Sequence, residues 1–282
     1  MYRIGLSTCG APNDALFAEY RRVGIEVAEI SLKGEAYPTF DYKAAANAAR
    51  NNGIELWSLH LPFTFELYDI SKEDIADGAV AALSEMIRRA SDIGIARMVI
   101  HPSGEPVPTD PAERHERMAR AKDSLARLAD VAGACGSVIA VEDLPRTCLG
   151  RNSDEVLELV SAHDALRVCF DTNHLLGEDA VTFIRRLKGK IITTHVSDYD
   201  FINERHWLPG EGKQDWKALL GALSEIDYDG VWLYEINPKC PWSIKRPRDL
   251  ICEDFVRNAH ELFEGKTPTV IGTPVAGIGM WA

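Results

Sequence analysis

Short apolar runs rich in β-branched residues alternate with longer stretches of helical periodicity along the whole chain. The runs that predict strands are YRIGLST (2–8), VAEISL (27–32), IELWSLH (54–60), ARMVIHP (96–102), SVIAVEDLP (137–145), LRVCFDT (166–172), KIITTHVS (190–197) and GVWLYEI (230–236). The clearest helical stretches are DYKAAANAARNNG (41–53), DIADGAVAALSEMIRRASDIG (74–94), RHERMARAKDSLARLADVAGACG (114–136), SDEVLELVSAH (153–163), DWKALLGALSEI (215–226) and PRDLICEDFVRNAHELF (247–263). Several of these helices end at a glycine that introduces the next strand, as expected of a C-terminal cap.

This alternation predicts a single (β/α)8 TIM barrel over residues 1–265, because each strand is followed by a helix or helical turn and no change in composition marks a linker. An open doubly wound sheet is the alternative. Such a sheet usually carries GxGxxG after its first strand, and TCGAPND lacks that pattern. Residues 266–282 are mostly apolar and unlike a helix, so we expect this tail to pack on the barrel or on a neighbouring subunit.

Charge and cysteine usage narrow the function classes. The net charge of -12 argues against a protein that grips nucleic-acid phosphates, and we expect no nucleic-acid partner. The six cysteines form no CxxC pair, which favours reduced thiols and a cytoplasmic location. The N-terminus does not resemble a signal peptide, and no window is apolar for long enough to span a membrane.

Side chains able to ligate a metal stand at the ends of six consecutive predicted strands. They are His60, His101, Glu142, Asp171, His195 and Glu235. In a TIM barrel these positions converge at the catalytic face. Each residue alone is more often a structural hydrogen-bond partner or a helix cap than a ligand. Six together at one barrel mouth would leave uncompensated charge in the absence of a metal, and this joint pattern predicts a metal site.

Three of these six side chains are carboxylates, and a donor set that combines all three with one imidazole is mostly oxygen. Three carboxylates and one imidazole favour Mn²⁺ or Mg²⁺, and the imidazole also makes Co²⁺ or Zn²⁺ compatible. His174 follows Asp171 by three residues in DTNH (171–174) and is expected to face the same pocket, as a substrate donor or a ligand to a second metal. In PGEG (209–212) the glycines predict a tight turn and not a nucleotide-phosphate loop, because GxxxxGK[ST] is absent.

Several of these segments together resemble the xylose isomerase-like TIM barrels, the sugar phosphate isomerase/epimerase superfamily that also includes endonuclease IV. The segments that carry the resemblance are LHLPF (59–63), VIHPSG (99–104), VEDLP (141–145), FDTNH (170–174), HVSDYD (195–200), HWLPGEGKQDW (206–216) and YEI (234–236). The resemblance runs from the first strand to about residue 264. It implies one divalent ion held by Glu142, Asp171, His195 and Glu235. It also implies that Glu142 and Glu235 act as an acid/base pair.

The first hypothesis is therefore a metal-dependent sugar or sugar phosphate isomerase or epimerase that works through a metal-stabilised enediolate. A keto-inositol dehydratase is a close variant, because elimination passes through the same enediolate. The residues predicted to contact the sugar or polyol are His60, His101, His174, His206 and Trp207. The aromatic side chains Phe63, Phe65, Trp207 and Trp242 are expected on mouth loops, where rings pack on the C–H face of a sugar. The resemblance also implies a homodimer or homotetramer.

The second hypothesis is an endonuclease IV-like zinc phosphodiesterase that acts on abasic DNA. His206 stands where ketose 3-epimerases often have an arginine, and Glu204 stands where endonuclease IV has an aspartate ligand, so these two residues are candidates for a second metal. His60 and His101 match further zinc ligands of that repair enzyme. Against this hypothesis, the connections hold no basic cluster except KRPR (245–248), which we interpret as a solvated helix start. A non-enzymatic barrel that binds a sugar or a partner without chemistry is the third hypothesis, disfavoured by the two candidate acid/base glutamates.

Overall fold

The computed structural model of the chain describes residues 1–64 and 66–279. Within this part, eight parallel strands form one sheet in the order β7-β6-β5-β4-β3-β2-β1-β8. The strands are β1 (Ile4–Ser7), β2 (Val27–Ile30), β3 (Glu55–His60), β4 (Arg97–Ile100), β5 (Val138–Glu142), β6 (Arg167–Asp171), β7 (Ile191–His195) and β8 (Trp232–Tyr234). Val196 joins β7 to β8, because its N–H donates to the Leu233 carbonyl (2.8 Å) and its carbonyl accepts from the Glu235 N–H (3.3 Å). The predicted (β/α)8 barrel is therefore confirmed.

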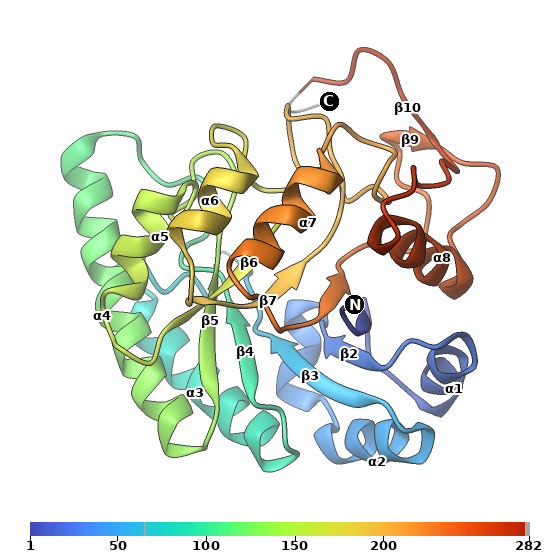
Figure 1. Cartoon of the computed structure of the whole chain (residues 1–282). Helices are drawn as coiled ribbons and strands as arrows, with labels where there is room; N and C mark the ends of the chain where they lie inside the picture. Colours follow the sequence, from blue (N-terminus) through green and yellow to red (C-terminus); the bar gives the residue numbers. More distant parts are fainter. Residues whose placement is uncertain (65, 280–282) are drawn as a thin grey trace.

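Helices surround the strands on the outside of the barrel (Figure 1). They are α1 (Asp14–Val23), α2 (Tyr42–Asn52), α3 (Ala76–Asp92), α4 (Pro111–Ala134), α5 (Ser153–Val160), α6 (Ala180–Arg186), α7 (Trp216–Glu225) and α8 (Cys252–Phe263), with a 3₁₀ turn η1 at Gly34–Thr39. Several begin at a side-chain cap, as where Asn13 accepts from the Leu16 N–H. α1 and α2 end at Gly24 and Gly53, as the glycine pattern predicts.

Helix α8 begins later than the sequence pattern indicates. The predicted stretch starts at residue 247, but the helix starts at Cys252. Pro247 has no N–H to donate, and the chain around it runs without regular structure until the Ile251 N–H donates to Asp254 (2.9 Å). The side chain of Asp254 thus fixes the first turn of α8.

The basic cluster KRPR (245–248) is only partly solvated: Lys245 and Arg248 are exposed, but the interpretation as a solvated helix start was wrong for Arg246. Arg246 is buried and forms an ion pair with buried Glu211 (2.6 Å). Arg248 pairs with Asp254 (2.6 Å) at the start of α8. Both arginines therefore neutralise carboxylates of the same chain, which leaves little of this cluster for an external phosphate.

The described part of the tail lies against the loops at the barrel mouth. β10 (Thr273–Pro274) pairs antiparallel with β9 (Ile244–Lys245), which lies in the connection after β8. The Gly272 N–H donates to Glu211 (2.7 Å), so the pair Glu211–Arg246 also holds the tail. Figure 1 shows the tail as the red trace above the carboxyl ends of the strands. Contact with a neighbouring subunit stays a prediction, and residues 280–282 lie outside the described part.

Candidate active site

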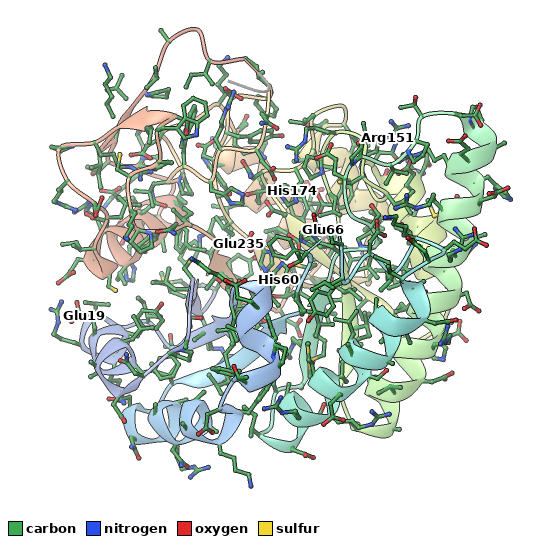
Figure 2. All side chains as sticks on the ribbon, turned by 180° about the vertical axis from the view of Figure 1, so that it is seen from behind. Glu19, His60, Glu66, Arg151, His174 and Glu235 are labelled. Atoms are coloured by element: carbon green, nitrogen blue, oxygen red, sulfur yellow. The ribbon has the colours of Figure 1, made fainter. Side chains whose placement is uncertain are left out.

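The strand-end residues singled out in the sequence meet at one end of the barrel. His60 ends β3, Glu142 ends β5, Asp171 ends β6 and His195 ends β7, while His101 and Glu235 directly follow β4 and β8. All of these side chains are buried except for small exposed fractions of His101 (16%) and Glu235 (18%). Figure 2 shows His60, His174 and Glu235 close to one another near the middle of the view.

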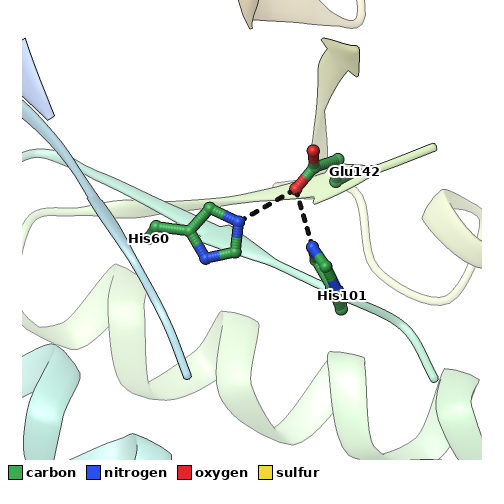
Figure 3. Close-up of side chains that lie close together, drawn as sticks. All are labelled: His60, His101 and Glu142. Carbon is green, nitrogen blue, oxygen red and sulfur yellow. Dashed lines mark hydrogen bonds and ion pairs between the residues drawn. The ribbon is translucent and has the colours of Figure 1, made fainter. Parts of the chain in front are cut away.

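Glu142 lies at the centre of this group. Its Oε1 lies 2.9 Å from Nδ1 of His195. Its Oε2 lies 3.2 Å from Nε2 of His60 and 3.1 Å from Nε2 of His101. Figure 3 shows these two imidazoles directed at the same carboxylate oxygen. One buried carboxylate therefore faces three ring nitrogens that come from three different strands.

Four of the side chains lie close enough together that they could hold one metal ion. Glu142, Asp171, His195 and Glu235 each offer one ligand atom, and these atoms lie within 4.8 Å of one another. Asp171 Oδ2 is buried and has no hydrogen-bond partner among the described residues. Nε2 of His174 lies 3.6 Å from this oxygen, beyond hydrogen-bond distance, and a buried carboxylate oxygen without a hydrogen bond is costly unless a cation neutralises it. The residues present thus fit a divalent cation held mainly by oxygen atoms.

Two further groups adjoin this one. His60, His101 and Glu142 form the first, and His174, Glu204 and His206 form the second, each with ligand atoms within 4.8 Å. Glu204 and His206, the two candidates for a second metal, therefore lie close together, and His174 is the third member of their group.

Glu204 and His206 are held by specific contacts. Arg146 pairs with Glu204 (2.8 Å), and Nε2 of His174 lies 3.1 Å from the same carboxylate. Nδ1–H of His206 donates to the Glu235 carbonyl (3.1 Å), which leaves Nε2 directed toward Glu204 (4.0 Å). The loop after β7 therefore delivers one carboxylate and one imidazole to the edge of the four-residue group.

A model of one protein family matches residues 17–252, and its description is "Xylose isomerase-like TIM barrel". This match covers most of the chain. The chain belongs to the xylose isomerase-like TIM barrel family. The resemblance drawn from the strand-end motifs is thereby confirmed.

Relatives of this xylose isomerase-like barrel include proteins named as sugar epimerases. An uncharacterized protein of Methanocaldococcus jannaschii is 30% identical over 116 residues, which span 38% of this chain and 40% of that protein. The D-psicose 3-epimerase of Ruminiclostridium cellulolyticum is 24% identical over 228 residues, 76% of this chain and 74% of that protein. The crystal structure of a D-tagatose 3-epimerase-like protein superposes with a TM-score of 0.75 at 23% identity, covering 85% and 92% of the two chains. The prediction that this family member is an enzyme is confirmed.

Electrostatics in this barrel keep the two glutamates ionised. Burial raises the pKa of Glu142, but His195 and His101 outweigh burial and hold that pKa well below its usual range. Burial likewise raises the pKa of Glu235, as does Glu142, but His195, His60 and His206 together outweigh both, so the net pKa is lowered. Both carboxylates can therefore accept a proton at neutral pH.

Two other groups of the same site have raised pKa values, which indicates that negative charge is in excess there. Burial raises the pKa of Asp171 to about 7, with Glu235 and Glu142 adding to the effect against His174. Burial lowers the pKa of His60, yet its hydrogen bond to Glu142 and the surrounding carboxylates raise it to about 9. Without a cation, protons bound to these groups offset the negative charge of the site, and a bound cation would offset that charge instead.

Sequence reasoning missed three buried residues of this site. Glu29, in the middle of β2, contacts Nε2 of His195. Cys169, interpreted only as a reduced filler, has its Sγ within 4.8 Å of ligand atoms of Glu142 and His195. Asp143 accepts from the Asp171 N–H (2.7 Å). A charged residue inside the apolar run VAEISL was the one signal that could have revealed Glu29.

The aromatic side chains that were predicted near the barrel mouth differ in where the structure places them. Trp207 is only 1% exposed, and its indole N–H donates to Ser243 (2.9 Å), so the structure does not support its predicted contact with substrate. Phe63 is 44% exposed and stacks on His101 with ring centroids 4.5 Å apart. Trp242 is exposed, and Phe65 lies outside the described residues. Phe63 thus borders the site through its contact with His101.

The described residues also bear on membrane contact. Among them, no helix has both the length and the apolar character needed to cross a bilayer.

Proposed function

We propose that this chain is a divalent-metal-dependent sugar or sugar phosphate isomerase or epimerase. The observation that carries the proposal is that two glutamate carboxylates face the same ring nitrogen of one histidine. Nδ1 of His195 lies 2.9 Å from Glu142 and 3.5 Å from Glu235. Asp171 completes a compact group of four ligand atoms around the space between these carboxylates.

The proposed chemistry is proton transfer at the carbon next to a carbonyl group. Glu142, Asp171, His195 and Glu235 would hold the divalent ion, with Mn²⁺ expected and Mg²⁺, Co²⁺ or Zn²⁺ as alternatives. When bound, such an ion polarises a carbonyl and stabilises the negative charge of an enediolate. One of the two glutamates removes the proton, and the same or the other glutamate returns it. Return to the other face inverts the carbon, and return to the neighbouring carbon interconverts aldose and ketose.

The surrounding side chains supply contacts for hydroxyl groups. His174 donates from Nδ1 to the Asp143 carbonyl (2.7 Å), which fixes its ring and leaves Nε2 facing Asp171 and Glu204. His60 is fixed in the same way through the Leu61 carbonyl (2.8 Å). We propose that His60, His101, His174 and His206 orient the hydroxyl groups of the substrate. The sugar names of the relatives support a ketose or related polyol as substrate.

The experiment is solvent deuterium incorporation. Protein loaded with Mn²⁺ is incubated in D₂O with free ketoses, ketose phosphates and a keto-inositol, and products are analysed by mass spectrometry and NMR. The proposal expects a deuterium atom beside the carbonyl of at least one compound, lost in Glu235→Gln and kept in Glu253→Gln, an exposed carboxylate on α8. Water loss from the keto-inositol alone would assign the dehydratase variant. No incorporation into any compound by metal-bound protein would overturn the proposal.

One observation favours a second candidate, a zinc phosphodiesterase of the endonuclease IV type acting on abasic DNA. The two ligand groups that adjoin the central four residues would allow more than one metal ion. The net charge of -12 and the internal pairing of Arg246 and Arg248 disfavour a DNA substrate. Nicking of an abasic-site duplex by zinc-loaded protein, abolished in Glu204→Gln, would reverse this order.

A further inference from the structure

Glu29 is a buried carboxylate that contacts one member of the group of four candidate ligands. It lies on β2, and its neighbours in the sheet are Ser7 on β1 and Ser58 on β3. Its side chain is fully buried. The Ser58 hydroxyl donates to Oε2 of Glu29 (2.7 Å). No arginine or lysine of the described residues pairs with Glu29, so nothing permanently charged offsets the cost of burying it.

The remaining contact of Glu29 is with His195, across the barrel on β7. Nε2 of His195 lies 3.1 Å from the Glu29 carboxylate. Nδ1 of the same ring faces Glu142 and Glu235. A carboxylate can only accept, so Nε2 carries the proton that it donates to Glu29. In the metal-free protein Nδ1 likewise donates to Glu142, and a cation would take the place of that Nδ1 proton while the proton on Nε2 stays with Glu29.

His195 differs here from the other histidines of the site. His60, His174 and His206 each donate from Nδ1 to a neutral backbone carbonyl. His195, by contrast, meets carboxylates at both ring nitrogens, Glu29 at Nε2 and Glu142 at Nδ1. A carboxylate makes the opposite ring nitrogen a stronger donor to a metal than a backbone carbonyl does. The unusual anchor thus falls on the histidine that belongs to the central four-residue group.

We propose that Glu29 is a positioning residue that holds His195 with Nε2 protonated and Nδ1 directed at a divalent cation. It would not touch substrate, and it acts only through His195. The inference rests on the proposed function to the extent that the four-residue group is taken as a metal site. It predicts a specific loss of metal affinity when Glu29 is changed.

The experiment measures metal affinity directly, by isothermal titration of metal-free protein with Mn²⁺. Glu29→Leu removes the acceptor and is expected to weaken binding by about 10- to 100-fold. Glu29→Gln keeps an acceptor oxygen and the shape of the side chain, and its expected loss is smaller. Ser58→Ala leaves the carboxylate in place but frees it to move, and it is expected to weaken binding less than Glu29→Leu.

The matched control is Thr193→Val. Thr193 also lies on β7 and accepts a buried hydrogen bond from Trp57 on β3 (3.1 Å), so this variant disturbs the same barrel interior without touching His195. Circular dichroism establishes that each variant is folded before titration. The control is expected to bind Mn²⁺ as the unmodified protein does.

The outcomes separate this inference from the proposed function. If the unmodified protein binds no divalent cation, the metal-dependent function fails. If it binds one and the Glu29 variants bind equally well, only the role of Glu29 is overturned. An equal loss in Thr193→Val would also overturn it, because the effect would then come from any disturbance of the barrel interior.

Discussion

The contacts of Glu142 make Glu142→Gln the most informative substitution in this protein, with Glu235→Gln as its partner. Both residues belong to the proposed metal site, yet they differ in what they contact. Glu142 is fully buried, with three ring nitrogens at 2.9 to 3.2 Å. Glu235 is 18% exposed, and its nearest ring nitrogens lie at 3.5 and 3.9 Å. The two substitutions should therefore have equal effects on metal binding and unequal effects on stability.

The magnitude follows from the loss of buried charge pairs. Removing one partner of a buried pair costs about 3–5 kcal/mol, because the other charge is left uncompensated. For a chain of this size, about 1 kcal/mol corresponds to roughly 2–4 °C in Tm. We expect metal-free Glu142→Gln to melt about 6–20 °C below the unmodified protein. The contacts of Glu235 are longer and partly exposed, so the free energy of unfolding of Glu235→Gln should lie within about 1 kcal/mol of that of the unmodified protein.

The assay is thermal unfolding followed by circular dichroism, with chelator and with saturating Mn²⁺. A bound cation raises the stability of the unmodified protein, by about 2.7 kcal/mol when its concentration is 100 times Kd. Both variants should lose most of this increase, since each lacks one ligand. The reasoning is refuted if metal-free Glu142→Gln melts with the unmodified protein, or if either variant keeps the full stabilisation by Mn²⁺.

Three further predictions concern pH, the loop after β7 and the tail. The pKa of His60 is raised from 6.5 to about 9, so the contribution of protonated His60 to folding stability is fully present below pH 6.5. The Tm of metal-free protein should therefore fall as pH rises through 9. In Gly212→Ala the new Cβ would meet Asp198 Oδ1 at 2.2 Å, which should cost about 1–3 kcal/mol in urea unfolding, whereas Gly221→Ala on α7 meets nothing and should not destabilise. Arg246→Met leaves Glu211 as an unpaired buried carboxylate and should cost about 3–5 kcal/mol, measured in the same way. A flat pH profile or stabilities equal to the unmodified protein would contradict these expectations.

Much of the site could be read from the chain because its residues end strands. Strand periodicity locates His60, Glu142, Asp171 and His195 in the sequence, and a parallel barrel brings all strand ends to one face. The alternation of strands and helices is a local property, so the fold follows from it without knowledge of long-range contacts.

Local sequence patterns predicted the environment of a side chain poorly where that side chain could be either exposed or buried. Trp207 stands in a mouth loop, but its indole N–H finds Ser243, and the ring turns into the protein. KRPR reads as exposed charge, but Arg246 finds Glu211 and becomes buried. In both cases the partner lies more than thirty positions away, at a distance of 36 and 35 residues.

The sequence by itself thus determined the barrel, its family and the residues at the ends of its strands, because these depend on short-range periodicity and residue type. Only the tertiary structure decided which of these residues share a ligand group and what holds each one in place. Glu29 and His195 are separated by 166 positions, and nothing local to either predicts that a carboxylate anchors that imidazole. The physical reason is that the role of a buried charged group depends on the group that it contacts, and that contact forms only when the strands close into the barrel.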